Sequence, residues 1–296
     1  MDNLKSKIQK ILSISFYILV LITFLFLQYL LCFKPILIPS DELINFQNLY
    51  KMFNGLELYK DINVIVTPLF FLIGKIVLTI FSPTIFSFRI FNFIIGTLFH
   101  VILFYIIYQK TNSPMIATVY FSTMFNFTYR LLLGGANYNL LALTFVLLGV
   151  ATFIKFKDKK YYHLLQGFIV FLVFFTKQSF GVFYGISILI YELVFYRKCF
   201  IKNNIKKFIA FIIPLIIYFL YLISNNNLYN FINYAFLGIH DFTTNIGFEA
   251  WAGVLLVLPI NIILFFKFKN YIDKSEWNDL TFLIFVSCGL LFISYP

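Results

Sequence analysis

The sequence predicts an all-α protein that crosses a membrane several times. Its 296 residues are 61% hydrophobic and only 12% charged, which is too little charge to cover the surface of a water-soluble domain. Apolar runs recur along the whole chain, many of them close to the roughly 20 helical residues that cross a hydrocarbon layer of about 30 Å. We therefore expect a polytopic helical membrane protein that forms a single transmembrane module over residues 1–296.

The apolar runs place about nine spans along the chain. The first run is too long for the h-region of a signal peptide and lacks a small-residue cleavage site, so we expect a retained anchor. The predicted spans cover about residues 11–33, 89–108, 114–130, 138–154, 162–176, 179–195, 208–223, 249–266 and 280–295. No soluble C-terminal domain is expected.

The basic residues set the expected orientation. With a cytoplasmic N-terminus, most of the 23 basic residues fall in cytoplasmic segments, as the positive-inside rule requires. They gather in short clusters between apolar runs, such as KFKDKK (155–160) and RKCFIKNNIKK (197–207), so the net charge of +11 does not indicate a nucleic-acid partner. The expected location is the cell (plasma) membrane, with any active site on the external side.

Residues 34–88 are expected to form one long external segment with interfacial helices. The stretch TPLFFLIGKIVLTIFSP (67–83) is apolar, but its core at 68–81 is short for a span and is interrupted by Lys75. An interfacial or re-entrant helix, with Lys75 reaching towards the headgroups, fits better.

A second interfacial helix is predicted between Ser40, a suitable N-cap, and the stop signal Asn54-Gly55. Its apolar residues recur at three- and four-residue spacing, so the helix can lie flat on the membrane. The stripe consists of Leu43, Phe46, Leu49, Tyr50 and Phe53. Asp41 and Glu42 then occupy the first turn, where the helix dipole favours carboxylates, at a fixed place on the external surface.

Several motifs follow one another in a recognisable order. Asp41-Glu42 opens the external segment, and GLELYKD (55–61) fits a G-x-x-x-Y-x-D pattern. Pro68-Leu69 then opens an interfacial helix, Arg89 begins the second span, and FFTKQSFGVF (174–183) lies between two short spans. This order resembles the GT-C superfamily of membrane glycosyltransferases. It is most similar to the protein-mannosyltransferase and aminoarabinose-transferase-like branch, glycosyltransferase family 39, whose members are usually longer than this chain.

The resemblance covers roughly residues 1–200 and implies a reaction. A sugar would move from a polyprenyl-phosphate donor to a glycan, lipid or protein acceptor on the outer face, with inversion. The chemistry of the residues agrees, because a carboxylate can take the proton of an attacking hydroxyl and a cation can stabilise the leaving phosphate. Asp41 is the candidate general base and Glu42 its neighbour. Alternatively, this pair only caps the helix.

The remaining candidates are substrate-binding residues. Lys177 lies between two short spans and suits a phosphate partner, although it could instead reach to the interface. Arg89 could form a two-pronged contact with a phosphate or anchor the membrane boundary. Tyr59 and Asp61 complete the pattern in the external segment, where Asp61 could also be an ordinary turn residue.

A late external loop holds His240-Asp241, which could contact a sugar hydroxyl or simply decorate the surface. No metal-ligand spacing or nucleotide-binding loop is found, so neither a metal nor another cofactor is expected, although some GT-C enzymes outside this branch use a divalent cation. Two alternatives stay open. One is a transporter or flippase for lipid-linked sugars, and the other is an inactive scaffold in an envelope-polysaccharide system.

Overall fold

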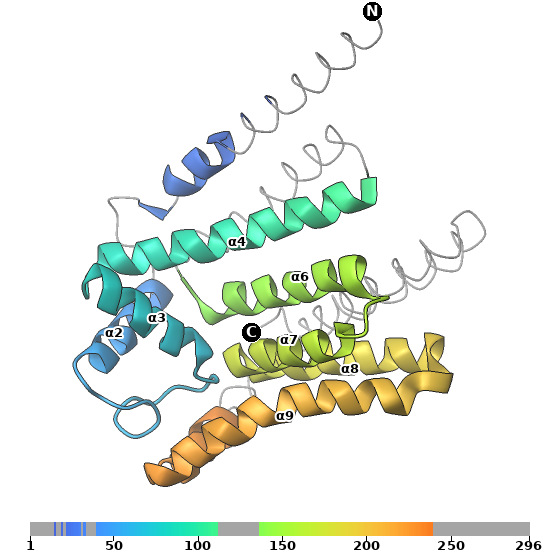
Figure 1. Ribbon diagram of the computed structural model, residues 1–296. Coiled ribbons are helices and arrows are strands. Elements are labelled where there is room, and N and C mark those ends of the chain that lie inside the picture. Colours follow the sequence, from blue (N-terminus) through green and yellow to red (C-terminus); the bar gives the residue numbers. More distant parts are fainter. Residues whose placement is uncertain are drawn as a thin grey trace, which may run out of the picture. The chain divides into compact units, whose positions relative to one another are not determined.

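The computed structural model describes residues 15, 19, 22–30, 32–33, 40–111 and 136–238 (Figure 1). No strand forms among these residues, and Leu58 and Ile62 make one isolated bridge. Four described helices are long and apolar enough to cross a membrane, namely Ile85–Gln109, Tyr138–Phe156, Gln178–Phe195 and Arg197–Ser224. An all-helical fold that includes helices long and apolar enough to cross a membrane is therefore confirmed for the described residues. The total of about nine spans and the GT-C topology stay predictions.

The structure gives the bounds of the helices directly. In chain order they are α2 (Ser40–Phe53), α3 (Leu69–Phe81), α4 (Ile85–Thr111), α6 (Tyr138–Phe156), α7 (Tyr162–Thr176), α8 (Gln178–Phe195), the 3-10 helix η1 (Arg197–Cys199), α9 (Phe200–Ser224), α10 (Leu228–Ile232) and the π-helix η2 (Asn233–Leu237). Predicted spans 114–130, 249–266 and 280–295 lie outside the described residues, as do His240 and Asp241.

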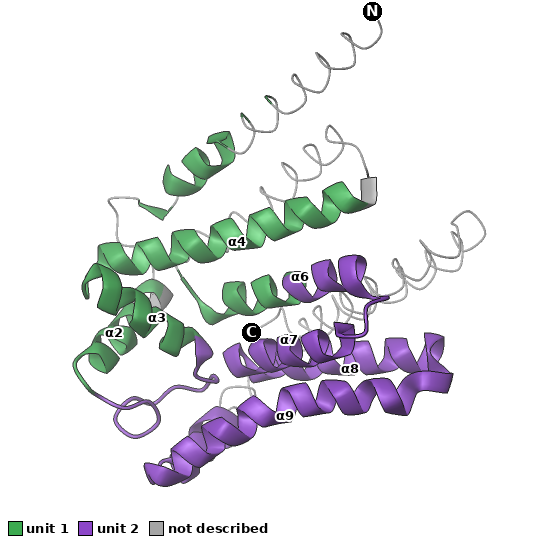
Figure 2. Ribbon diagram, viewed as in Figure 1, with its two compact units in different colours: residues 1–55, 70–147 green, residues 56–69, 148–296 purple. Residues whose placement is uncertain are grey.

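The chain divides into two compact units (Figure 2). Unit 1 comprises residues 1–55 and 70–147, and unit 2 comprises residues 56–69 and 148–296. Unit 1 therefore holds α2, nearly all of α3, α4 and the first half of α6. Unit 2 holds a loop of the predicted external segment together with α7, α8, α9 and the short helices that follow.

Aromatic packing forms the core of unit 1. Phe70 on α3 is fully buried and lies 5.3 Å from the ring of Phe91 on α4. Gly74 allows α2 to approach α3 closely, because a Cβ at this position would lie 2.7 Å from Cδ1 of Leu49. α3 has 13 residues and is about 20 Å long, too short to cross the hydrocarbon layer, as the sequence predicted.

The face that α2 buries differs from the predicted apolar stripe. Leu43 and Tyr50 are each 45% exposed, whereas Glu42 and Asn45 are buried together with Leu49. The polar face of α2 therefore turns inward, where its groups have partners in unit 1. Most of the stripe stays free to contact lipid.

In unit 2, α7, α8 and α9 run alongside one another (Figure 1). α7 matches the predicted span 162–176, and α8 begins one residue before the predicted 179–195. α9 begins at Phe200, well before the predicted 208, because its first two turns carry the charged residues that lower the hydropathy there. Glycines allow close contacts: a Cβ at Gly167 on α7 would collide with the backbone of Lys207 on α9.

Candidate functional site

A buried ion pair fixes the start of α2 in unit 1. Nε of Arg89 on α4 lies 3.0 Å from Oε1 of Glu42, and the two side chains are 11% and 4% exposed. Such a pair is held firmly because removing either partner leaves an uncompensated buried charge. Asp41 lies beside Glu42 in the same helical turn, and its side chain is outside the described part of the structure.

Further polar groups surround the inner face of α2. Asn45 donates a hydrogen bond to the carbonyl oxygen of Ala136 at 3.3 Å, which ties the helix to the chain just before α6. Asn92, one turn beyond Arg89 on α4, donates to Sγ of Cys32 at 3.6 Å. The predicted pair Asp41-Glu42 therefore sits on a helix anchored by side-chain contacts within unit 1.

In unit 2, the loop that carries Tyr59 is built around that side chain. Tyr59 adopts a positive φ of 68° and is 1% exposed. Its hydroxyl donates to the carbonyl oxygen of Val66 at 2.8 Å, its N–H donates to Ile62, and its ring lies edge-on to Phe231. Burial raises the pKa of Tyr59 well above its usual range, so the hydroxyl stays protonated. The buried contacts of Tyr59 thus stabilise the conformation of the loop.

Asp61 closes the turn of the same loop. Its Oδ2 accepts a hydrogen bond from the N–H of Glu57 at 2.8 Å, and its own N–H donates back to the carbonyl oxygen of Glu57. The Asp61 side chain is nevertheless exposed. It can therefore stabilise the turn and still contact a ligand.

Gln178 in the FFTKQSFGVF segment and Thr67 in the loop that carries Asp61 join distant segments of unit 2. Nε2 of Gln178 donates to the carbonyl oxygens of Ile65 in the loop, at 2.8 Å, and of Ala235 in η2, at 2.6 Å. Thr67 donates from the loop to the carbonyl oxygen of Phe174 at 2.7 Å. These contacts place the loop against the α7–α8 junction.

Asn227 adds a third connection, since its side chain donates to the carbonyl oxygen of Leu58 at 2.7 Å. All three donors are buried side chains that satisfy loop or junction carbonyls. Such bonds are expensive to break, because the carbonyl would then be left buried without a partner. Gln178 belongs to a motif noted in the sequence, but the sequence alone could not show that its side chain connects the loop to the α7–α8 junction.

Lys177 is the single extended residue between α7 and α8, with φ −150° and ψ 113°. Its Nζ lies 4.8 Å from the ring centroid of Phe180, and the residue is half-buried. Burial lowers the pKa of Lys177 to about 8. A negatively charged ligand would offset this desolvation, so the junction is a suitable place for a phosphate.

A buried charge cluster in unit 2 was not predicted. Glu192 on α8 forms an ion pair with Lys207 on α9, and its Oε1 lies 3.5 Å from Nδ1 of His163 on α7. Nζ of Lys207 also lies 3.5 Å from Oδ1 of Asn204. The sequence places Glu192 near the end of an apolar run, where a carboxylate is costly without a partner. That cost signals a partner but does not identify it.

No family model, curated protein or solved structure matches this chain. The GT-C resemblance therefore stays a prediction that rests on the quoted motifs. Among the described residues, no three His, Cys, Asp or Glu side chains gather in a way that could hold a metal ion.

Proposed function

We propose that this chain is a GT-C-type membrane glycosyltransferase that uses a polyprenyl-phosphate sugar as donor. The observation that supports this most is the joining of two motif segments more than 100 residues apart. Gln178 and Thr67 hydrogen-bond the loop that carries Asp61 to the junction that carries Lys177. A rigid arrangement of this kind is what an enzyme needs to hold an anionic lipid donor at the membrane surface.

In the proposed reaction, the acceptor hydroxyl attacks the anomeric carbon and forms the new glycosidic bond. The bond from that carbon to the phosphate oxygen breaks, and its electron pair leaves with the polyprenyl phosphate. Lys177 stabilises the negative charge that develops on the phosphate. The resemblance assigns removal of the hydroxyl proton to Asp41, and attack from the face opposite the leaving group would invert the configuration.

The ion pair changes the proposed roles of Glu42 and Arg89. Because Nε of Arg89 is engaged with Glu42, we assign both as positioning residues that orient the helix end next to Asp41. We therefore assign Arg89 to positioning rather than to binding of the donor phosphate. The acceptor, a glycan, lipid or protein, would reach the site from the outer face, to which the predicted orientation assigns the exposed Asp61.

Transport of a lipid-linked sugar is the second candidate function, and a specific observation favours it. Polar groups are buried between the helices of unit 2, where Tyr184 donates to Gln166 at 3.0 Å and Gln166 donates to the carbonyl oxygen of Gly149 at 2.7 Å. With the Glu192–Lys207 pair, they give this helical unit a polar interior. Buried polar groups of this kind also occur along transport pathways.

The two functions separate in a transfer assay with radiolabelled polyprenyl-phosphate sugars and membranes that contain the protein. We expect the wild type to transfer sugar to an endogenous acceptor, and Lys177→Met to reduce kcat by a factor on the order of 10². Lys75→Met on α3 is the matched control and should retain transfer. Accumulation of intact labelled lipid on the opposite leaflet, without transfer, would support transport. Equal transfer by wild type and Lys177→Met would contradict the proposed role of this lysine.

A further inference from the structure

We infer that the start of α9 holds an anionic phospholipid, independently of any sugar-transfer activity. A surface groove of about 490 Å³ lies along this part of unit 2. Its lining combines four basic side chains with two isoleucines: Arg197, Lys198, Ile201, Lys202, Ile205 and Lys206. This composition offers a charged site for a phosphate directly beside an apolar surface for an acyl chain.

The helical periodicity separates the two chemistries into neighbouring rows. Lys202 and Lys206 on α9 stand at four-residue spacing, and with Lys198 on the preceding η1 they form a cationic row along the groove. Ile201 and Ile205 belong to the adjacent row and are 74% and 53% exposed. A lipid can therefore place its headgroup on one row and its chain on the other.

Lys207 does not belong to the cationic row. It is 7% exposed and pairs with Glu192 on α8. This inward contact fixes the rotation of α9 about its axis within unit 2. As a result, the neighbouring Lys206 and Lys202 are directed away from the α8 contact, into the groove.

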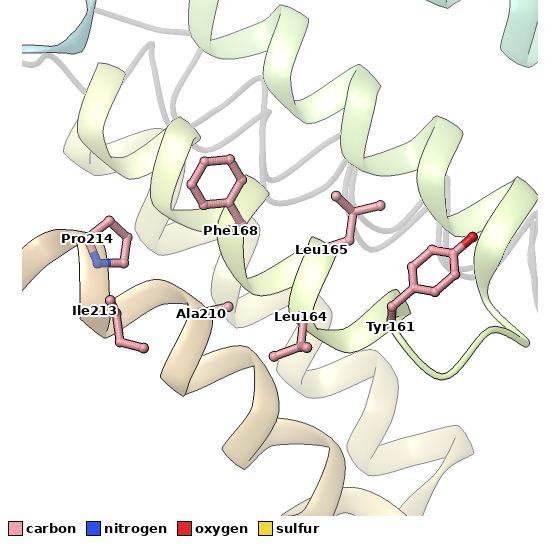
Figure 3. Close-up of a pocket in the computed structure, with 7 residues that line it drawn as sticks. All are labelled: Tyr161, Leu164, Leu165, Phe168, Ala210, Ile213 and Pro214. Carbon is pink, nitrogen blue, oxygen red and sulfur yellow. The ribbon is translucent and has the colours of Figure 1, made fainter.

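The apolar row continues along α9 towards a second groove. Ile209, Ile213 and Ile217 extend the four-residue spacing, and each is between 43% and 63% exposed. Figure 3 shows the second groove, about 580 Å³ in volume, lined from α7 and α9 by Tyr161, Leu164, Leu165, Phe168, Ala210, Ile213 and Pro214. From Ile201 to Ile213 the helix rises about 18 Å, close to the roughly 15 Å of one leaflet's hydrocarbon.

Pro214 shapes the second groove. A proline inside a helix has no N–H, so the carbonyl of Ala210 loses its usual helical donor. Both residues line the groove, whose walls are otherwise almost entirely apolar. An acyl chain fits such walls, whereas an acidic peptide or a nucleic acid would leave its polar backbone without partners there. The charge and the continuous apolar path together identify the occupant as an anionic phospholipid.

The test compares two variants that each lose four positive charges. The groove variant carries Arg197→Gln, Lys198→Gln, Lys202→Gln and Lys206→Gln. The loop variant, a matched control at the end of α6 and in the turn that follows, carries Lys155→Gln, Lys157→Gln, Lys159→Gln and Lys160→Gln. Full-length proteins are reconstituted in equal parts of phosphatidylglycerol and phosphatidylcholine. The lipid retained after mild detergent extraction is then counted by native mass spectrometry.

We expect the wild type and the loop variant to retain phosphatidylglycerol in preference to phosphatidylcholine. In the groove variant, the ratio of retained phosphatidylglycerol to phosphatidylcholine should fall about tenfold or more. A variant in which the three groove lysines become arginines should keep the preference for phosphatidylglycerol. This result would show that the loss in the groove variant comes from the missing charge and not from misfolding. Equal retention of both lipids by the wild type would overturn the inference. Equal losses of this preference in both glutamine variants would also overturn it, as would an unchanged preference in the groove variant.

Discussion

The protonation state of Lys177 connects its burial to the proposed reaction. Its amine is half-buried at the α7–α8 junction, and burial lowers its pKa to about 8. A lysine with this pKa is still charged at neutral pH but loses its proton within the experimentally accessible range. The same group can therefore be followed both through activity and through stability.

We expect transfer activity to fall as the pH rises above about 8, because the neutral amine no longer stabilises the leaving phosphate. Lys177→Arg keeps its charge at every accessible pH, so its activity should show no such decline. The measurement is the pH profile of kcat/KM for both proteins. A wild-type profile that stays flat up to pH 10 would remove Lys177 from the mechanism.

Stability should change in the opposite direction over the same range. Between the folded pKa of about 8 and the unfolded value of 10.5, the unfolded chain binds the proton more strongly than the folded chain. The contribution of Lys177 to the free energy of unfolding therefore rises with pH through this window. Thermal unfolding in detergent measures this effect. The Tm of Lys177→Met minus that of wild type should be larger at pH 7 than at pH 10.

At the scale of elements, the loop and the α7–α8 junction are held together by few side chains. Gln178→Leu removes the amide that bonds both Ile65 and Ala235, and leaves these two carbonyls without that donor. We expect hydrogen exchange of residues 56–67 to become faster, because opening this loop then costs less free energy. Hydrogen–deuterium exchange with mass spectrometry measures this directly.

Gln166→Leu is the matched control for this prediction. Gln166 is also a buried glutamine of unit 2, but its side chain bonds Gly149, Thr152 and Tyr184 rather than the loop. Its substitution should leave exchange in 56–67 unchanged. If the two variants accelerate exchange in the loop equally, the effect reports general destabilisation and the bridging role of Gln178 is wrong.

The sequence predicted elements well where apolar periodicity alone decides them. The bounds of α7 and the near-match of α8 follow from uninterrupted apolar runs between charged turns. The prediction for α9 began too late because Lys202, Lys206 and Lys207 interrupt the apolar run without interrupting the helix. The inward-facing polar side of α2 was not predicted, since a partner for Glu42 only becomes visible once α2 and α4 are packed together.

At the scale of the whole molecule, the described helices combine exposed apolar surfaces with polar contacts inside each unit. The candidate site motifs could be proposed from sequence because they are contiguous, as in Asp41-Glu42 and the segment around Lys177. The Glu192–Lys207–His163 cluster could not, because three separate helices contribute one residue each. Which charge meets which depends on helix packing that no single run of sequence specifies.

The cluster yields a prediction about the stability of unit 2. Glu192→Leu leaves the buried Lys207 without its carboxylate and should lower the free energy of unfolding by about 3–5 kcal/mol. A double variant, Glu192→Leu with Lys207→Leu, should be less destabilised than either single substitution, because no uncompensated charge remains. Unfolding in detergent, analysed as a double-mutant cycle, measures the coupling. Additive effects would show that the pair contributes nothing to the packing of α8 against α9.

The central claim is that a carboxylate at the start of α2 acts on an acceptor hydroxyl. The most direct test is transfer of radiolabelled sugar from polyprenyl-phosphate donors by wild type and by Asp41→Asn, with Asp158→Asn in the α6–α7 turn as control. Asparagine keeps the size of the side chain but cannot take a proton. We predict transfer by wild type and the control, and a loss of about 10²–10⁴-fold for Asp41→Asn at equal protein level. Equal transfer by all three would contradict the claim and leave Asp41 as a helix-capping residue.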